Sequence, residues 1–361
     1  MKQKKLLALI GSICLIVAMV ACAAPAPAPP TPTPTPTPTP APTPAPEVFE
    51  WRMSGFLPRG ASQEPPLIRL CDKIREASDG QLDITYYAVN EIVPVMETWE
   101  AVGKGVTEMA YSYGAYWLGK TPLAAYSCGL AYTMRDERDF YVLLHVLGLE
   151  DVIREAYAEH NIYLVSIAPC MQTVMQTKFP VTKVADLEGR TIRATGMIAD
   201  MLTEAGASTV YFPGGEIYGA LERGVVEGVV YGPLSSQYDQ GFHEVTSYLL
   251  LPGLAATEAD EFLVNMDAWN SLPDNLKEIL VLACSEESRF HTGLYRHYSE
   301  LALKDQVENW GTTVTYMPEE ERAKMAAYMV KVMEKYSAED PYFAEATEIV
   351  KDYMRLIGLL D

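Results

Sequence analysis

Basic residues are scarce in this chain of 361 residues, and their scarcity excludes one class of partner. Lys and Arg together number 28 against 48 Asp and Glu, which gives a formal net charge of -20. Nucleic acids and anionic lipid surfaces are bound mainly through contacts between basic side chains and phosphates. We therefore expect no nucleic-acid partner and no basic membrane-binding face.

The sequence also lacks the common signatures of catalysis. It contains no GxSxG, HExxH or GxGxxG motif, so the usual patterns of a serine nucleophile, a zinc protease and a dinucleotide site do not occur. Its five histidines show no metal-ligand spacing. We predict that the protein is not an enzyme and has no catalytic residues and no cofactor.

The first long hydrophobic run indicates export. Residues 6–20 are apolar and follow Lys2, Lys4 and Lys5, and the run is too short for a stable spanning helix. We predict a signal peptide over residues 1–21. The run ends in Met-Val-Ala-Cys22, which resembles a bacterial lipoprotein box, so Cys22 is the expected lipidation site and the protein is expected to be anchored to the cell membrane on its outer side. An ordinary signal peptide cut after Ala21 is the alternative.

Residues 23–46 contain only Ala, Pro and Thr, including 12 of the 25 prolines. A segment of this composition cannot bury a core and favours extended polyproline II at about 3.1 Å per residue. We predict that residues 22–46, the lipidated cysteine with its Pro/Thr/Ala linker, act as a stalk.

The four cysteines of the body, after the linker, suggest no metal site. Their spacing fits no CxxC or zinc pattern, and a body of this size needs no disulfide for stability. Four buried thiols are the favoured interpretation, although one disulfide stays open in an exported chain. These cysteines are Cys71, Cys128, Cys170 and Cys284.

The body alternates strand and helix patterns. Residues 49–53 alternate like a strand, residues 66–77 carry an apolar helical face, and residues 82–87 again read as a strand. A strand, a helix and a second strand in this order predict a βαβ unit, and hence an α/β fold with parallel strands covered by helices.

One unit of this body occurs twice, at an offset of 119 residues. The residues Glu97, Ala101, Gly105, Val106 and Glu108 recur as Glu216, Ala220, Gly224, Val225 and Glu227. Each copy reads as a helix stopped by glycine and followed by a strand, over residues 106–111 and 225–231. The repeat predicts two similar α/β lobes with a cleft between them, whereas chance similarity of two common helix-to-strand corners is the alternative.

Arg193 is the main candidate for a ligand contact in that cleft. It ends a predicted strand, and Thr195 is a possible N-cap of a helix over residues 196–204. Ligands of open α/β sheets bind beyond the carboxyl ends of strands, and a guanidinium can hold a carboxylate in two parallel hydrogen bonds. A surface ion pair is the alternative role for this arginine.

Aromatic residues follow both repeated strands. Tyr113, Tyr116 and Trp117 come after the first, and Tyr231 comes directly after the second. Side chains at these positions would face each other across the cleft and offer apolar surface with hydroxyl groups. Packing within the core is the alternative for each of them.

Several spaced motifs together resemble the solute-binding proteins of tripartite ATP-independent periplasmic (TRAP) transporters. The resemblance spans about residues 49–335 and rests on the following segments: Glu97–Ala110, Gly119–Pro122, Asp186–Arg193, Gly206-Ala207 and Pro213–Gly224. It implies a two-lobed periplasmic-binding-protein-like fold, or venus flytrap, with hinge-crossing strands and C-terminal helices. By this resemblance, residues 47–168 and 259–300 form lobe I, residues 169–258 form lobe II, and residues 301–361 brace the lobes.

The nearest branch of that family binds 2-oxo acids and lactate. It is suggested by Pro213–Glu216, Gly232-Pro233, Phe262–Asn265 and Asp267–Trp269. The resemblance places Arg193 on the carboxylate-binding arginine, Gln172 on a ligand-side glutamine and Tyr116 on a cleft tyrosine. The full set of expected ligand-binding residues is Arg193, Gln172, Tyr116, Tyr113, Trp117, Tyr231 and Phe56.

The metal site of that branch is not reproduced in the sequence. Carboxylates that hold a metal ion there would align near Val229 and Ala256, neither of which can coordinate a hard cation. We expect a metal-free site, with Glu258 or Glu261 as alternative carboxylates if the loop is shifted.

The resemblance implies a receptor that captures an organic acid, closes about its hinge and delivers the ligand to TRAP membrane permease subunits. We expect a monocarboxylate ligand. Two other functions stay open at this point: an anchored enzyme that acts on carboxylated substrates without a metal, and a sensory ligand-binding protein.

Overall fold

The computed structural model describes residues 47–61, 63–127 and 130–360. The predicted signal peptide, Cys22 and the linker lie outside these residues, as does Cys128, so the structure tests none of those predictions. The cysteines that it does describe, Cys71, Cys170 and Cys284, are buried free thiols.

The first sheet has five strands in the order β2-β1-β3-β10-β4. Strand β1 pairs in parallel with β2 and β3, and β10 pairs antiparallel with β3 and β4. The strands are β1 Phe49–Gly55, β2 Leu82–Tyr87, β3 Met109–Tyr113, β4 Ile162–Pro169 and β10 Ala259–Asn265. The predicted βαβ opening is present, since β1 and β2 are parallel neighbours on either side of helix α1, Glu64–Ala77.

The second sheet has six strands in the order β11-β9-β5-β8-β6-β7. Strand β6 pairs in parallel with β7 and β8, and β5 pairs antiparallel with β8 and β9. The strands are β5 Thr173–Thr177, β6 Thr191–Arg193, β7 Ser208–Val210, β8 Gly228–Val230, β9 Tyr248–Ala255 and β11 Thr313–Tyr316. The pairings of β7-β6-β8-β5 therefore repeat those of β2-β1-β3-β10 in the first sheet.

The chain crosses between the two sheets through two short connections. Strand β4 leads through residues 170–172 into β5, and β9 leads through residues 256–258 into β10. The backbone joins the connections, because Cys170 N donates to Glu258 O and Glu258 N donates to Met171 O. The sheets are thus linked by paired strands, as expected of a two-lobed α/β protein, and the predicted fold class is confirmed.

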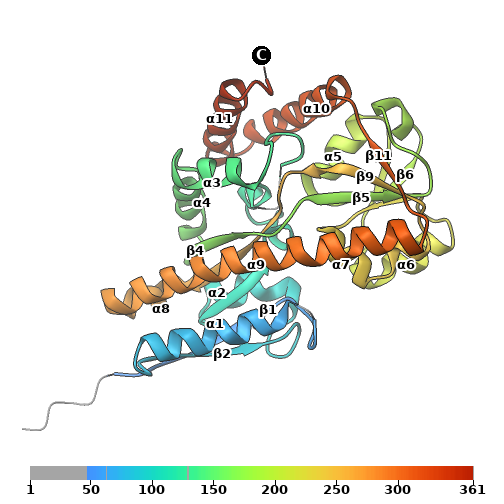
Figure 1. Cartoon of the computed structure of the whole chain (residues 1–361). Helices are drawn as coiled ribbons and strands as arrows, with labels where there is room; N and C mark the ends of the chain where they lie inside the picture. The colour runs from blue at the N-terminus through green and yellow to red at the C-terminus, as the bar shows by residue number, and fades with distance from the viewer. Residues whose placement is uncertain (1–46, 62, 128–129, 361) are drawn as a thin grey trace, which may run out of the picture. The chain divides into compact units, whose positions relative to one another are not determined.

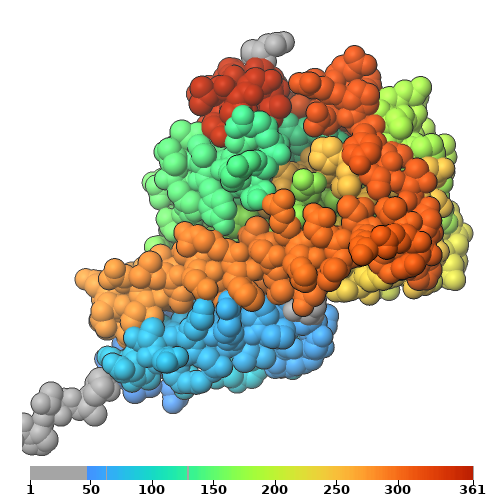
Figure 2. Space-filling model, viewed as in Figure 1, coloured from blue at the N-terminus to red at the C-terminus, as the bar shows by residue number. Residues whose placement is uncertain are grey.

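Helices cover both sheets and connect them. The long helix α9, Asp274–Asn309, contacts β4 and α1 beside the first sheet and α7 beside the second. Figure 1 shows α9 running past both sheets, and in Figure 2 it forms a continuous orange band on the surface. The predicted boundary between lobe I and the C-terminal helices, at residue 300, falls inside α9.

The C-terminal helices α10, Glu319–Ser337, and α11, Pro341–Leu356, pack on each other and on helices of both lobes. Helix α10 packs on α5, where Tyr336 donates a hydrogen bond of 2.8 Å to Asp200. Helix α11 packs on α3 and α4. The remaining helices are α2 Thr98–Gly103, α3 Glu137–His145, α4 Leu149–Ala158, α5 Gly196–Glu204, α6 Gly214–Glu222, α7 Leu234–Asp239 and α8 Met266–Ser271, with short 3-10 turns η1 Val95–Glu97, η2 Gly114–Trp117, η3 Pro122–Tyr126, η4 Val184–Leu187 and η5 Phe242–Glu244.

The two copies of the repeated unit adopt the same corner. Gly105 and Gly224 both have positive φ angles, of 68° and 73°, and the residue after each donates its N–H to the helix carbonyl five residues back. This is the Schellman ending that glycine allows. The Glu108 carboxylate then pairs with Arg52, and the Glu227 carboxylate pairs with Arg190. The two copies therefore form equivalent corners, as the repeat predicts.

Candidate functional site

A cavity of about 420 Å³ lies where the strands of both sheets end. Most residues that line it lie at or after the ends of β1 and β3 of the first sheet and of β6 and β8 of the second, and Thr173 and Glu258 line it beside the crossings. Parallel strands of the two sheets therefore direct their carboxyl ends toward one cavity, the position at which open α/β sheets bind ligands.

Arg193, at the end of β6, is almost completely buried in the wall of this cavity, with 4% of its surface exposed. Its Nε and Nη2 donate to the carbonyl of Phe212, each at 3.2 Å, and Nη1 donates to the carbonyl of Val230 at 3.0 Å. Burial lowers the pKa of this guanidinium. Within the part of the chain that the structure describes, no carboxylate forms an ion pair with it.

Two tyrosine rings flank the guanidinium. The Arg193 Cζ atom lies 5.2 Å from the ring centroid of Tyr211 and 5.3 Å from that of Tyr231. Both rings line the cavity. Cation–π contacts of this kind hold a guanidinium in place without neutralising its charge, so the cavity keeps a positive end.

The apolar side of the cavity comes from the first sheet. Phe56, Tyr113 and Tyr116 all line it. Their rings contact one another, with centroids 6.2 Å apart for Phe56 and Tyr116 and 5.8 Å apart for Tyr113 and Tyr116. The structure therefore brings together five of the seven predicted ligand-binding residues.

Trp117 and Gln172 lie elsewhere. The Trp117 indole is buried in the core, where its Nε1 donates to the Tyr157 hydroxyl at 3.3 Å and its ring packs against Trp99. Gln172 Oε1 accepts the Gly253 N–H at 2.9 Å and lines a different groove. Neither residue lines the cavity, because Trp117 packs in the core and the Gln172 side chain is held by Gly253 of β9.

Thr195 occupies the N-cap position of α5, but its side chain makes no capping hydrogen bond. Its N-cap placement was predicted correctly. The residue also lines the cavity, so the start of α5 borders it.

Sequence reasoning missed a set of cavity residues on the hinge and on α9. Asp260 and Tyr295 line the cavity, and Glu258 lines it although the sequence suggested it only as a substitute metal ligand. Burial raises the pKa of Asp260 to about 6, partly offset by hydrogen bonds from Tyr111 and Cys170. An unusual run of acids, Glu258 to Glu261, inside an otherwise apolar stretch was the available signal; Tyr295 lies far along the chain and carried none.

The described residues provide no cluster of side chains that would ligate a metal ion in the cavity. Within residues 47–61, 63–127 and 130–360 there is no group of three or more His, Cys, Asp or Glu side chains that could hold a metal ion. Val229 and Ala256 do not line the cavity, and neither does Glu261, whose Oε1 accepts the Tyr157 hydroxyl at 2.8 Å. The prediction of a metal-free site stays a prediction.

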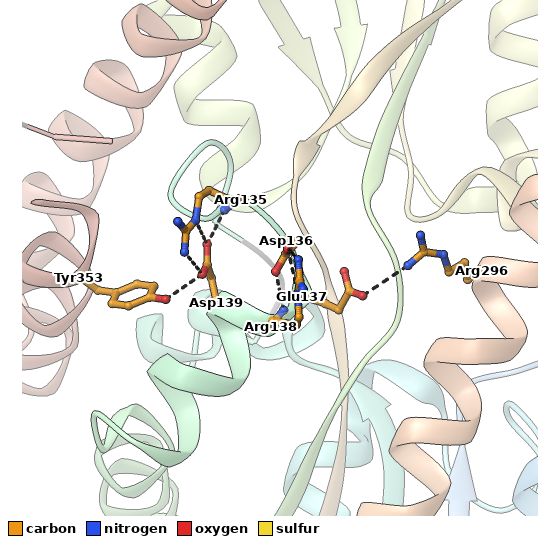
Figure 3. A network of polar contacts seen from close by, with 7 residues as sticks. All are labelled: Arg135, Asp136, Glu137, Arg138, Asp139, Arg296 and Tyr353. Atoms are coloured by element: carbon orange, nitrogen blue, oxygen red, sulfur yellow. Dashed lines mark hydrogen bonds and ion pairs between the residues drawn. The ribbon is translucent and has the colours of Figure 1, made fainter. Parts of the chain in front are cut away.

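A second groove, of about 720 Å³, lies between the start of α3 and the C-terminal half of α9. Glu137 of α3 and Arg296 of α9 form an ion pair of 3.6 Å beside it (Figure 3). In the same view, Asp139 accepts hydrogen bonds from Arg135 and from Tyr353 of α11. These contacts tie α3 to α9 and to α11.

Comparison with known proteins assigns the family. The model of the bacterial extracellular solute-binding proteins, family 7 (DctP), matches residues 53–340. The chain belongs to this family. DctP proteins are solute-binding components of TRAP transporters and are not enzymes, which confirms the prediction that this chain is not an enzyme. Within the described residues no helix is long and apolar enough to cross a membrane.

Relatives of known ligand extend the comparison. The monocarboxylate 2-oxoacid-binding periplasmic protein of Nostoc sp. is 25% identical over 315 residues, covering 85% of this chain and 84% of the relative. A TRAP solute-binding protein of Colwellia psychrerythraea, solved with calcium and pyruvate, has a TM-score of 0.78 at 22% identity, covering 86% of this chain and 95% of the other. One from Bordetella bronchiseptica, solved with calcium and picolinate, has a TM-score of 0.76 at 24% identity, covering 87% and 94%.

Proposed function

We propose that this chain is the solute receptor of a TRAP transporter that binds an organic monocarboxylate in the cavity through Arg193. The observation that carries the proposal is a buried guanidinium whose hydrogen bonds, among the described residues, all go to backbone carbonyls. A buried cation is costly unless a negative group joins it. A ligand carboxylate would supply that charge and accept the remaining N–H donors in a bidentate pair.

The aromatic lining of the cavity supports a ligand whose remaining part, beyond the carboxylate, is small and largely apolar. Phe56, Tyr113 and Tyr116 face the guanidinium side of a cavity of about 420 Å³, and cavities of this size hold small molecules. Monocarboxylate 2-oxo acids are the ligands named for the Nostoc relative, and pyruvate was bound in the Colwellia protein. These relatives support a monocarboxylate for this chain as well.

We further propose that binding closes the cavity and that the closed receptor delivers its ligand to the permease subunits. The cavity is lined by both sheets, and two short crossings join them, so a ligand that contacts both sides would stabilise a closed form. The lipid on Cys22 and the linker would keep the receptor at the outer face of the membrane.

Isothermal titration of the full chain with pyruvate, lactate, butyrate, benzoate and succinate tests the proposal. We expect at least one monocarboxylate to bind with no chemical change in the ligand. Arg193→Ala should weaken binding at least about thirtyfold, since removing one partner of a buried charged pair typically costs about 2 to 5 kcal/mol.

Arg190→Ala is the matched control. Arg190 lies three residues earlier, pairs with Glu227 near the surface and does not line the cavity. It should bind like the wild type. Equal affinity of Arg193→Ala and the wild type would contradict the carboxylate role, and turnover of the acid would contradict the receptor function.

A further inference from the structure

Glu258 is one of the two carboxyl groups that line the cavity, and its two oxygens are in different environments. Oε2 accepts a hydrogen bond from the Thr173 hydroxyl at 3.1 Å and lies 3.5 Å from the Tyr113 hydroxyl. Oε1 lies against Gly232, where an added Cβ would come within 2.6 Å of it, and accepts no hydrogen bond from the described residues. Oε2 is therefore the acceptor oxygen, and Oε1 is left for the ligand.

The surroundings of Glu258 favour its neutral form. Burial and then the negative charge of Asp260 raise its pKa to about 8, against smaller opposing effects of Thr173, Tyr113 and Arg193. The other titratable groups close to it are Cys170, Tyr231 and Tyr295, whose pKa values burial raises, so they stay uncharged near neutral pH. Of the two cavity carboxyl groups, Asp260 therefore ionises first.

Resting on the proposed function, we propose that Glu258 is the second ligand anchor and that its neutral carboxyl group donates a hydrogen bond from Oε1 to an acceptor oxygen of the ligand. Arg193 fixes one end of the ligand as a carboxylate. The ligand class is then a monocarboxylate with an oxo or carbonyl oxygen close to its carboxylate. The proton on Glu258 would stabilise this oxygen by a hydrogen bond, where a bound cation would do so by its charge.

Calorimetric titration of the full chain in the presence of EDTA, with pyruvate and with propionate, tests this. The two acids have three carbons each and differ in the 2-oxo oxygen. We expect pyruvate to bind about tenfold more tightly than propionate, as one hydrogen bond allows. The affinity for pyruvate should be constant between pH 6.5 and 7.5 and about tenfold weaker at pH 9, because the donor proton is lost.

Glu258→Gln separates donation from charge. Its amide keeps a donor and cannot titrate, so at pH 7 it should bind pyruvate within about threefold of the wild type and should keep that affinity to pH 9. Glu261→Gln is the control on the same strand, because Glu261 is a buried carboxyl group that does not line the cavity. It should keep the wild-type pH dependence of pyruvate binding.

Three results would overturn the role of Glu258 while leaving the receptor function intact. They are an affinity that rises with pH, loss of pyruvate binding in Glu258→Gln at pH 7, and binding that appears only when calcium replaces EDTA. Each would mean that Glu258 does not act as a neutral hydrogen-bond donor to the ligand. Failure of every acid to bind under all conditions, or binding unaffected by Arg193→Ala, would instead contradict the proposed function.

Discussion

Arg193 owes its position to its neighbours in the backbone and to two tyrosine rings. The backbone carbonyls of Phe212 and Val230 take three of its hydrogen bonds, and they come from the ends of the strands on either side of β6. The rings of Tyr211 and Tyr231 cover its faces. The geometry of the guanidinium therefore depends on the carbonyls and rings that surround it.

Tyr211→Ala should weaken binding of the monocarboxylate by about two- to fivefold, since an exposed cation–π contact is worth about 0.5 to 1 kcal/mol. Tyr211 is 57% exposed, so the fold should not depend on it. Titration calorimetry measures the affinity, and Tyr316→Ala, at an equally exposed tyrosine beside the other groove, should leave it unchanged. A loss above about thirtyfold would mean that Tyr211 contacts the ligand directly.

The sequence predicts which residues have side chains suited to a ligand site better than it predicts which way those side chains point. Arg193 could be placed because a strand end and a helix start fix where its side chain goes. Tyr116 and Trp117 are neighbours in the 3-10 turn η2, and the turn directs one ring to the cavity and the other into the core. Composition and spacing are the same for both outcomes, so the sequence could not separate them.

The bounds of helices and strands were predicted best where a nearby residue such as glycine marks their end. Strand β2 and helix α5 have the predicted bounds, since Gly80 and Gly206 mark chain reversals. The predicted strand over residues 106–111 begins only at Met109. Val106 N is used by the helix ending and the Glu108 carboxylate accepts the Arg52 N–H, so these residues complete the corner before the strand starts.

Helix α3 is fixed to α11 by one carboxylate, and this contact predicts an effect on stability. Asp139 accepts hydrogen bonds from Arg135 and from the Tyr353 hydroxyl at 2.7 Å, and the Arg135 hydrogen bond is the main reason that its pKa is lowered to about 2 (Figure 3). Asp139→Asn should destabilise the fold by about 1 kcal/mol at pH 7, a value discounted for the exposure of Arg135.

Urea unfolding measures this change. A folded-state pKa below the unfolded value of 3.8 stabilises the protein above that value, and the stabilisation is lost as pH falls toward 2. The difference between wild type and Asp139→Asn should therefore shrink in acid. Asp151→Asn, which removes an exposed pair with Arg154, should be neutral throughout; a similar effect of both variants would argue against a specific role of Asp139.

The whole molecule is built from two related sheets that exchange strands at the hinge. The sequence repeat indicated that the two sheets are related. It did not indicate that β10 beside β3 and β5 beside β8 occupy equivalent places, because each of these strands pairs with a strand distant from it in sequence. Nor could spacing show that α9 spans both sheets. The fold therefore depends on pairing between distant segments, which local sequence patterns do not specify.

Two buried carboxyl groups at the hinge make the stability of the whole fold depend on pH. Burial raises the pKa values of Glu258 and Glu261 to about 8, whereas both ionise near 4.5 when exposed. Between pH 6.5 and 8 the folded chain therefore keeps two protons that the unfolded chain has lost. Stability must fall as pH rises through this window, by up to about 1.4 kcal/mol per pH unit for each proton.

Thermal unfolding of the ligand-free chain between pH 6.5 and 8 tests this coupling. The buried His291, with a pKa lowered from 6.5 to about 4, acts in the opposite direction and mostly below pH 7, and its effect is the same in every variant. Glu261→Gln and Glu258→Gln should each remove about half of the decrease in Tm, and the double variant should be nearly flat, because each variant removes one titrating proton. Wild-type stability that is constant or rises over the same range would show that the two carboxyl groups are already ionised in the folded chain, and would remove the neutral acid on which the role of Glu258 as a donor depends.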